Sequence, residues 1–308
     1  KGKIIDKARS SGIPVSPKRN VILLMSLLLG LIIPIAGITI RSLLRNQIEN
    51  KEELEKLSSV PILGEISKSE QPGNIIIREN NTNRFTEMFR LLRTNLLFVL
   101  GEPGQKVINI VSSVGGEGKT FISINLAISL ALLDKKVLII GLDLRKPKLG
   151  EYLELNCETG ISQFLSGNMD QNDLIRPSGI HPNLSIITAG PVPPNPGELM
   201  AKPALDKLMV ELKKEFDYII LDTAPIGIVS DSYALNRLAD VNLYIVRADY
   251  TPKRTIEDAT ILYKEKKLNR MYFILNATDF KKAPYQYGYG KRYGYDKKYG
   301  YGYEEKSL

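Results

Sequence analysis

Short apolar runs alternate with amphipathic stretches over residues 84–280, and this alternation is the clearest pattern in the chain. Six of these runs read as strands: 106–113, 136–144, 184–190, 218–224, 241–249 and 270–278. The stretches beside them read as helices: 86–100, 119–133, 160–165, 203–215, 230–238 and 255–266. Short apolar strands set between helices predict an α/β domain with a doubly wound, mainly parallel sheet covered on both faces.

A different apolar pattern precedes this domain. Residues 21–40 (VILLMSLLLGLIIPIAGITI) are twenty residues without a charge, and a helix of that length rises about 30 Å, the thickness of a bilayer core. We therefore predict a transmembrane helix. The alternatives are a buried core helix or a signal-peptide core. A signal peptide is disfavoured because a polar, proline-containing segment precedes the run and no small-residue cleavage site follows it.

The remaining segments are polar. Residues 1–20 are expected to form an extended juxtamembrane lead-in, and 41–83 a stalk and linker, with a charged helix over 41–59 and a turn-rich linker over 61–83. Residues 281–308 (KKAPYQYGYGKRYGYDKKYGYGYEEKSL) lack aliphatic side chains to bury and are expected to be disordered.

Composition narrows the possible chemistry. The formal charge of +8 suits an anionic partner, which can be a nucleotide, a nucleic acid or a membrane surface. With Cys157 as its single cysteine the chain forms no intrachain disulfide, which fits a reducing cytosol. One histidine, His181, argues against a histidine-based zinc site or triad. Asp, Lys, Thr and Tyr side chains must therefore supply most of the chemistry.

Residues 113–120 (SVGGEGKT) follow a predicted strand and open a predicted helix, the setting that a phosphate-binding P-loop requires. Glycine lets backbone N–H groups turn inward around phosphate oxygens, lysine reaches the β- and γ-phosphates, and threonine can hold Mg²⁺. Serine at the first position departs from the strict pattern. The alternative is a glycine-rich turn with an incidental GKT. We predict binding of ATP or GTP through Gly115, Gly116, Glu117, Gly118, Lys119, Thr120 and Phe121.

A strand that ends in an acid, 219–225 (IILDTAP), matches the Walker B pattern. Asp222 at its carboxyl end can orient Mg²⁺ or its waters beside the P-loop. Asn276 ends a later strand and can contact the nucleobase, although a polar strand cap is an equally good interpretation.

These motifs together with the tyrosine-rich C-terminus resemble the bacterial tyrosine kinases (BY-kinases), in the MinD/ParA-like branch of P-loop ATPases. The apolar run and its lead-in resemble the second membrane helix of a Wzc-type polysaccharide co-polymerase. The resemblance implies an ATP- and Mg²⁺-dependent tyrosine autokinase that phosphorylates a neighbour's tail in a homo-oligomeric ring. It also implies control of capsule or exopolysaccharide polymerisation and export, a tyrosine phosphatase as a partner, and a place in the bacterial inner membrane.

Flanking charge alone would place the N-terminal side of the apolar run in the cytoplasm. We instead expect the kinase domain on the cytoplasmic side, because its nucleotide site needs cytosolic ATP.

The family carries a second acidic motif, Walker A′, on the strand after the P-loop helix. Asp143 and Arg145 match this motif, but Gly141 stands where the first aspartate is expected. In the family the two acids help to bind Mg²⁺ and accept the proton of the attacking tyrosine. The resemblance thus assigns catalysis to Lys119, Asp143, Asp222 and Arg145, and Mg²⁺ to Thr120, Asp143 and Asp222. Our hypothesis is that the chain binds Mg·ATP normally and transfers phosphate poorly.

A further family feature is E-x-x-R-x-x-R in the helix before the P-loop, here Glu87, Arg90 and Arg93. Spacings of three and six residues place them near one helix face. The resemblance implies a contact between subunits of a ring. Without it, a solvated charged face is the preferred interpretation.

Eight tyrosines with Gly and Lys or Arg between them lie in the C-terminal segment: Tyr285, Tyr287, Tyr289, Tyr293, Tyr295, Tyr299, Tyr301 and Tyr303. We interpret them as phosphoacceptors, ahead of an inert tail and of a nucleic-acid-binding segment; a membrane span makes a nucleic-acid partner awkward. Two rival functions stay open, a MinD/ParA-like switch ATPase and a scaffold whose nucleotide site transfers nothing.

Overall fold

The computed structural model of the chain describes residues 18–43, 45–69, 73–77, 83–101, 104–155, 157–227 and 235–279. The chain divides into two compact units, residues 1–46 and residues 47–308. The C-terminal tail with its eight tyrosines and most of the N-terminal lead-in lie outside the described residues.

The first unit contains helix α1 (Arg19–Leu43), which includes the apolar run. Its segment Arg19–Gly37 is long and apolar enough to cross a membrane, with a mean hydropathy of 2.3. Two hydroxyl groups in the helix donate to carbonyls of the preceding turn, Ser26 to Leu23 and Thr39 to Ile35. These polar groups therefore need no water, as a bilayer core demands.

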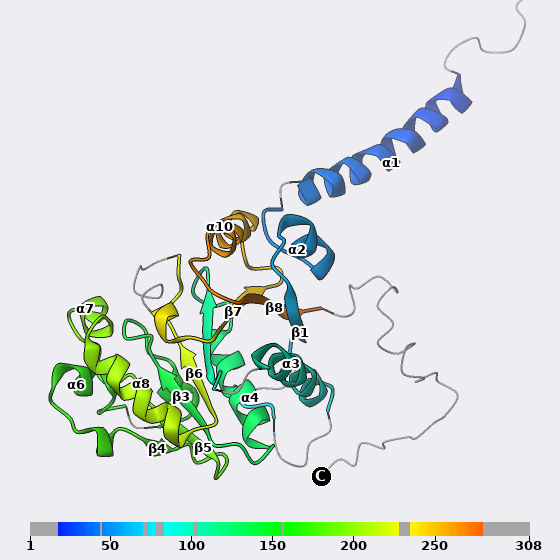
Figure 1. The fold of residues 1–308 in the computed structure, drawn as a ribbon. Helices are drawn as coiled ribbons and strands as arrows, with labels where there is room; N and C mark the ends of the chain where they lie inside the picture. The colour runs from blue at the N-terminus through cyan, green and yellow to red at the C-terminus, as the bar shows by residue number, and fades with distance from the viewer. Residues whose placement is uncertain are drawn as a thin grey trace, which may run out of the picture. The chain divides into compact units, whose positions relative to one another are not determined.

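The second unit is built on an eight-stranded sheet in the order β1-β8-β7-β2-β6-β3-β5-β4 (Figure 1). Its strands are β1 (Ile62–Ser67), β2 (Val107–Ser112), β3 (Val137–Gly141), β4 (Arg176–Pro177), β5 (Leu184–Ile187), β6 (Tyr218–Asp222), β7 (Val241–Arg247) and β8 (Met271–Thr278). Among the described pairs only β4 with β5 is antiparallel. The doubly wound, mainly parallel sheet that the pattern predicts is confirmed.

Helices cover both faces of this sheet, which is why its central strands are continuous apolar runs. One face packs against α3 (Arg84–Leu100) and α4 (Lys119–Ala131). The other face packs at one end against α6 (Ile161–Ser166), α7 (Pro196–Met200) and α8 (Pro203–Glu215), and at the other end against α2 (Lys51–Leu57) and α10 (Lys253–Lys264). Strand β7 shows the alternation: Leu243 faces α3 and α4, and Tyr244 faces α2 and α10.

Three short helical segments complete the described elements. These are α5 (Leu149–Tyr152) and the 3₁₀ helices η1 (Gln171–Asp173) and η2 (Leu235–Leu238). The helix expected over 230–238 appears only as η2, because residues 228–234 lie outside the described part.

The segment that we expected to be a stalk and linker differs from that expectation. No single helix spans 41–59: α1 ends at Leu43, and α2 starts only after Asn50. Asn50 Oδ1 accepts from the backbone N–H of Glu53, while Glu53 Oε2 accepts from the N–H of Glu49. This reciprocal cap fixes a new helix start.

Residues 47–67 are part of the second unit. Ile48 and Leu54 are fully buried, and β1 adds a parallel strand beside β8. The linker pattern hid this strand because β1 (ILGEIS) lies at the sheet edge, where polar residues can alternate with buried ones.

Candidate nucleotide site

The P-loop joins the end of β2 to the start of α4, at the carboxyl edge of the parallel sheet. Gly116 and Gly118 have φ angles of 86° and 96°, which L side chains rarely adopt. A Cβ on Gly118 would also lie 2.3 Å from Asn276 Nδ2. The glycines are therefore required by both backbone conformation and space.

Glu117 braces the loop from inside. Its side chain is fully buried, and its carboxylate accepts from the Val114 N–H at 2.9 Å, from Ser113 Oγ at 2.9 Å and from the Thr251 hydroxyl. Any contact of Glu117 with a nucleotide would thus come from its backbone. Ser113, the departure at the first motif position, gains a role here as a donor to this carboxylate.

Two residues at the carboxyl end of β7, which no sequence motif marks, hydrogen-bond to the loop. Tyr250 Oη donates to the Gly115 carbonyl at 2.8 Å, and Arg247 Nη1 donates to the Gly116 carbonyl at 2.7 Å. The available signal was their place at or just after the carboxyl end of β7, a strand that pairs with β2. Polar residues at that position face the phosphate loop.

Asn276, expected to contact a nucleobase, lies against the P-loop. Its Nδ2 donates to the Glu117 carbonyl at 2.9 Å, and its Oδ1 accepts from the N–H of Ala277 at 2.8 Å. Phe121 lies in the first turn of α4 with its ring edge-on to Phe89 of α3, at a centroid distance of 6.1 Å. Both side chains therefore contact protein in this structure.

Lys119 and Thr120 point to the interior of the site. Lys119 is 8 % exposed, and its Nζ donates to Ser112 Oγ at 3.0 Å. Burial lowers the pKa of Lys119, an effect that the nearby Asp222 and Asp143 carboxylates oppose. A buried ammonium beside two carboxylates provides a counter-charge for phosphate.

Asp222 ends β6 directly beside the first turn of α4. Thr120 Oγ1 donates to Asp222 Oδ2 at 2.7 Å, and Ser123 Oγ lies 3.4 Å from Asp222 Oδ1. Burial raises the pKa of Asp222 to about 6, against the lowering effect of Lys119 and of these hydrogen bonds. The structure thus unites the P-loop threonine with the Walker B carboxylate.

The Walker A′ segment lies on the neighbouring strand. Gly141 is the sheet partner of Asp222, and the N–H groups of Leu142 and Asp143 both donate to the Asp222 carbonyl. Asp143 Oδ1 accepts from the N–H groups of Arg145 and Lys146, at 3.2 and 3.0 Å. This turn holds the Asp143 carboxylate close enough to Asp222 to raise the pKa of Asp222.

A small pocket opens beside these carboxylates at Gly141, which has no side chain to fill it. It is lined by Gly141, Asp143, Pro147, Lys148, Leu149, Gly150, Cys157, Ala189, Gly190 and Asp222. A Cβ on Gly141 would lie 3.3 Å from the Ala189 nitrogen and 3.4 Å from Leu149 Cδ2. A side chain there would enter the pocket with only a small adjustment of its neighbours.

The donors gathered here suit magnesium bound together with phosphate. Among the described residues no cluster of three or more His, Cys, Asp or Glu side chains forms a metal site. The site offers instead one hydroxyl and two carboxylates, from Thr120, Asp143 and Asp222. Mg²⁺ takes oxygen ligands and usually binds through one or two carboxylates plus substrate phosphates, so this donor set fits the ion.

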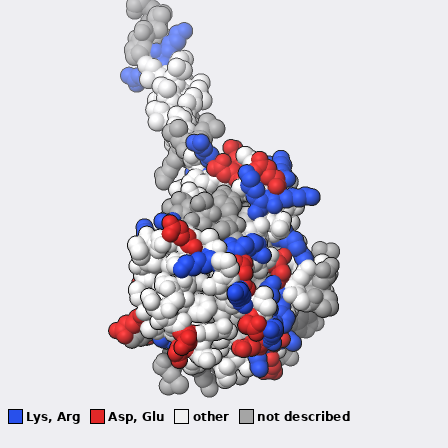
Figure 2. All heavy atoms as spheres, turned by 60° about the vertical axis from the view of Figure 1, so that its left-hand side comes forward, with Lys and Arg blue, Asp and Glu red and all other residues white. Residues whose placement is uncertain are grey.

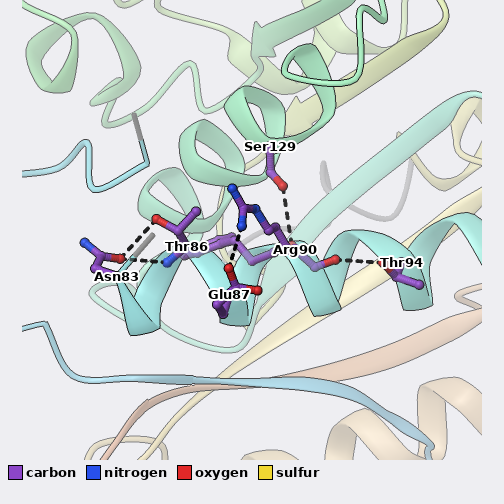
Figure 3. Close-up of polar contacts among 7 residues, drawn as sticks. Asn83, Thr86, Glu87, Arg90, Thr94 and Ser129 are labelled. Carbon is purple, nitrogen blue, oxygen red and sulfur yellow. Dashed lines mark hydrogen bonds and ion pairs between the residues drawn. The ribbon is translucent and has the colours of Figure 1, made fainter. Parts of the chain in front are cut away.

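The three residues of the E-x-x-R-x-x-R motif do not act alike, and Figure 3 shows the contact between two of them, Glu87 and Arg90. Arg90 pairs with Glu87 on the exposed side of α3. Arg93 turns to α4, where its Nη1 donates to the Ser129 carbonyl at 2.5 Å. That carbonyl belongs to the last turn of α4, where carbonyls lack a partner within the helix, so Arg93 holds α3 to α4.

Charges of both signs are interspersed on the face of the second unit shown in Figure 2. Ion pairs in this unit include Arg237 with Asp206 and Lys214 with Glu211, each at 2.8 Å. The excess of positive charge is therefore not gathered in one basic area on that face, as a nucleic-acid-binding surface would require.

Comparison with known proteins places this site in a family. Residues 105–255 match a family described as AAA domain. The chain is 31% identical to the tyrosine-protein kinase ptk of Acinetobacter johnsonii over 92% of its own length and 40% of the relative's. It is 31% identical to the putative tyrosine-protein kinase in cps region of Klebsiella pneumoniae, over 93% of its length and 42% of that protein. The chain thus spans less than half of the curated relatives that it matches.

Solved structures agree with this result. The kinase domain of the Escherichia coli tyrosine kinase ETK has a TM-score of 0.69 and 28% identity, covering 79% of this chain and 100% of that one. The chimerical protein CapA2B2 has a TM-score of 0.69 and 29% identity, covering 74% and 99%. The folded unit therefore shares the fold of both structures.

Proposed function

We propose, for a chain that belongs to the family of bacterial tyrosine kinases, that its folded unit binds Mg·ATP and transfers the γ-phosphoryl group to tyrosine. The observation that carries this proposal is the meeting of Thr120 with Asp222 at 2.7 Å, beside the buried Lys119 and the half-buried Asp143. These groups are the parts that in-line phosphoryl transfer needs, since its catalysis is mainly positioning and electrostatic stabilisation.

In this proposal each residue of the site has a role that suits its position around the P-loop. The N–H groups of Gly115–Gly118 surround the phosphates, Lys119 neutralises the β- and γ-phosphates, and Arg145 orients the acidic turn. Thr120, Asp143 and Asp222 would hold Mg²⁺, which supplies charge neutralisation between the phosphates when bound. The tyrosine phenol oxygen attacks the γ-phosphorus as the bond to the bridging oxygen breaks. ADP leaves, and the phenol proton passes to a carboxylate of the site.

Asp143 and Asp222 are the candidates to accept that proton, because Gly141 offers none. Burial already raises the pKa of Asp222 to about 6, and a proton acceptor works best with a pKa near the operating pH. The single missing carboxylate is then expected to slow transfer more than it weakens nucleotide binding.

The acceptors in this proposal are the eight C-terminal tyrosines, mostly those of a neighbouring copy in a ring that Glu87 and Arg90 help to form. A chain with a helix apolar and long enough to span a bilayer is consistent with a membrane-anchored protein. We place it in the bacterial inner membrane with the kinase domain on the cytoplasmic side. The name of the Klebsiella pneumoniae relative, which refers to a cps region, supports a role in capsule or exopolysaccharide export, with a tyrosine phosphatase to reset the tail.

Mass spectrometry of the tail tests the proposal. The full chain in detergent is dephosphorylated, incubated with Mg·ATP and digested, with Lys119→Met as the blank. Phosphotyrosine at 285–303 that depends on Lys119 is the expected result. ATP hydrolysis without phosphotyrosine, in this chain and in Gly141→Asp, would instead identify a switch ATPase. Nucleotide binding with neither reaction in either chain would identify a scaffold.

A further inference from the structure

Three consecutive carbonyls of the P-loop each accept a hydrogen bond from a side chain at or just after the carboxyl end of β7 or β8, the last two described strands along the chain. The Gly115 carbonyl accepts from Tyr250, that of Gly116 from Arg247, and that of Glu117 from Asn276, at 2.8, 2.7 and 2.9 Å. The three donors lie 131 to 159 residues after their acceptors. They are therefore tertiary contacts that the loop motif itself does not provide.

These contacts fix the direction of the loop's N–H groups. In a trans peptide the carbonyl and the N–H of the same unit point in opposite directions. Holding the carbonyls of residues 115–117 toward the donors therefore turns the N–H groups of residues 116–118 the other way. Those N–H groups are the ones that a P-loop directs at phosphate oxygens.

The two donors at the carboxyl end of β7, Arg247 and Tyr250, are themselves held in place. The Arg247 N–H donates to Thr251 Oγ1 at 2.8 Å, and the Arg247 guanidinium lies over the Tyr250 ring at 5.1 Å from its centroid. The backbone of Ile48 also hydrogen-bonds to the residues that follow Arg247. Its carbonyl accepts from the N–H of Asp249 at 2.7 Å, and its N–H donates to the carbonyl of Thr251 at 2.9 Å. Donors with a fixed position hold their acceptors without a further ordering cost.

We infer that Tyr250 and Arg247 are positioning residues of the phosphate cradle, which hold the P-loop in its anion-binding shape before a nucleotide arrives. Arg247 also adds a positive charge behind the loop. The inference rests on the proposed function, since it takes the P-loop to bind a nucleotide. It assigns to Tyr250, whose side chain is 41 % exposed, a part in binding that does not require it to touch the ligand.

The test measures the affinity of the full chain in detergent micelles for Mg·ADP, by calorimetry, together with the thermal unfolding midpoint without nucleotide. Tyr250→Phe removes only the hydroxyl group. Loss of one such hydrogen bond is expected to weaken Mg·ADP binding by about two- to tenfold, with an unchanged nucleotide-free midpoint. Arg247→Ala should weaken binding more, and Arg247→Lys should restore part of it. Tyr263→Phe and Arg254→Ala, on α10 of the same unit, are the matched controls and should bind as the unchanged chain does.

Two outcomes would overturn the inference while leaving the proposed function intact. One is wild-type affinity in Tyr250→Phe and Arg247→Ala. The other is a loss of affinity that is accompanied by a lower unfolding midpoint of the nucleotide-free chain. That result would mean that the two residues only support the fold. Failure of the proposed function looks different, because the unchanged chain would then show no Lys119-dependent tail phosphotyrosine while the binding comparison could still be made.

Discussion

Gly141 and Asp222 are direct partners in the sheet, so the position without a side chain lies beside the buried Walker B carboxylate. The pocket next to them is lined by Gly141, Asp143 and Asp222, so a carboxylate introduced at position 141 would lie beside the other two. We predict that Gly141→Asp accelerates tail phosphorylation by about tenfold or more, because it returns a proton acceptor to the site. Gly141→Asn, of equal size, is the control, and quantitative phosphotyrosine mass spectrometry is the measurement. An equal rate in all three chains would refute the hypothesis that Gly141 limits transfer.

The same substitution should carry a cost in stability. A second carboxylate beside Asp222 adds like-charge repulsion, and the new Cβ lies 3.3 Å from the Ala189 nitrogen. We expect the nucleotide-free unfolding free energy of Gly141→Asp to fall by about 1 to 3 kcal/mol. Gly141→Ala separates crowding from charge, and a smaller loss in Gly141→Ala than in Gly141→Asp is the expected order.

Asp222 gives a prediction with a defined pH range. Its pKa is 3.8 as an ordinary aspartate and about 6 in the fold. Between these values the folded state binds more protons, so the contribution of Asp222 to stability falls as pH rises and its penalty is complete above pH 6. Nucleotide-free Asp222→Asn should therefore exceed the unchanged chain in unfolding free energy by up to about 3 kcal/mol at pH 7, with a difference that shrinks toward pH 4. A difference independent of pH, like that of the exposed Asp258→Asn control, would contradict this account.

Substitutions of Arg93 and Arg90 should have different effects on stability and assembly, although the two residues share a motif. Arg93→Ala leaves the Ser129 carbonyl in the last turn of α4 without its donor, and we expect a loss of about 1 to 2 kcal/mol in unfolding free energy. Arg90→Ala breaks an exposed pair and should change stability by less than about 0.5 kcal/mol. If Arg90 contacts a neighbouring subunit as proposed, light scattering will show a smaller assembly for Arg90→Ala. An unchanged assembly would remove Arg90 from the interface.

Asn125 of α4 joins the segment 73–77 to the folded unit through three hydrogen bonds and forms a fourth within α4. Its Oδ1 accepts from the N–H groups of Ile76 and Ile77, and its Nδ2 donates to the carbonyls of Asn74 and Phe121. Asn125→Ala should speed amide hydrogen exchange at residues 76 and 77 far more than in β2. Exchange that stays slow at both amides would show that other contacts hold the segment.

The sequence predicted the parts of this protein that depend on local patterns. The mainly parallel sheet follows from buried apolar strands set between helices, and the P-loop and Asp222 follow from motifs whose spacing reflects phosphate and metal chemistry. Edge strand β1 was missed because its polar residues match a linker as well as they match a packed edge, whereas α2 lies within the helix expected over 41–59. The break after Leu43 depends on the cap at Asn50, a feature of single side chains.

The contacts that shape the site were harder to predict for a physical reason. Tyr250, Arg247 and Asn276 are polar residues at strand ends, where many side chains are compatible with the pattern. Which carbonyl each one meets depends on the order of strands in the sheet. The expected nucleobase contact of Asn276 remains a prediction, but its amide is already bonded to the P-loop.

The late position of these donors in the sequence has a consequence for folding during synthesis on the ribosome. Residues 113–120 are translated well before residues 247–276, and β1 has to wait for β8 to find its partner. A nascent chain that ends before β7 carries the complete P-loop motif without the groups that orient it. Contacts between distant parts of a sequence also form slowly. Full nucleotide affinity should therefore arise late, when the last two described strands join the sheet and their side chains reach the P-loop carbonyls.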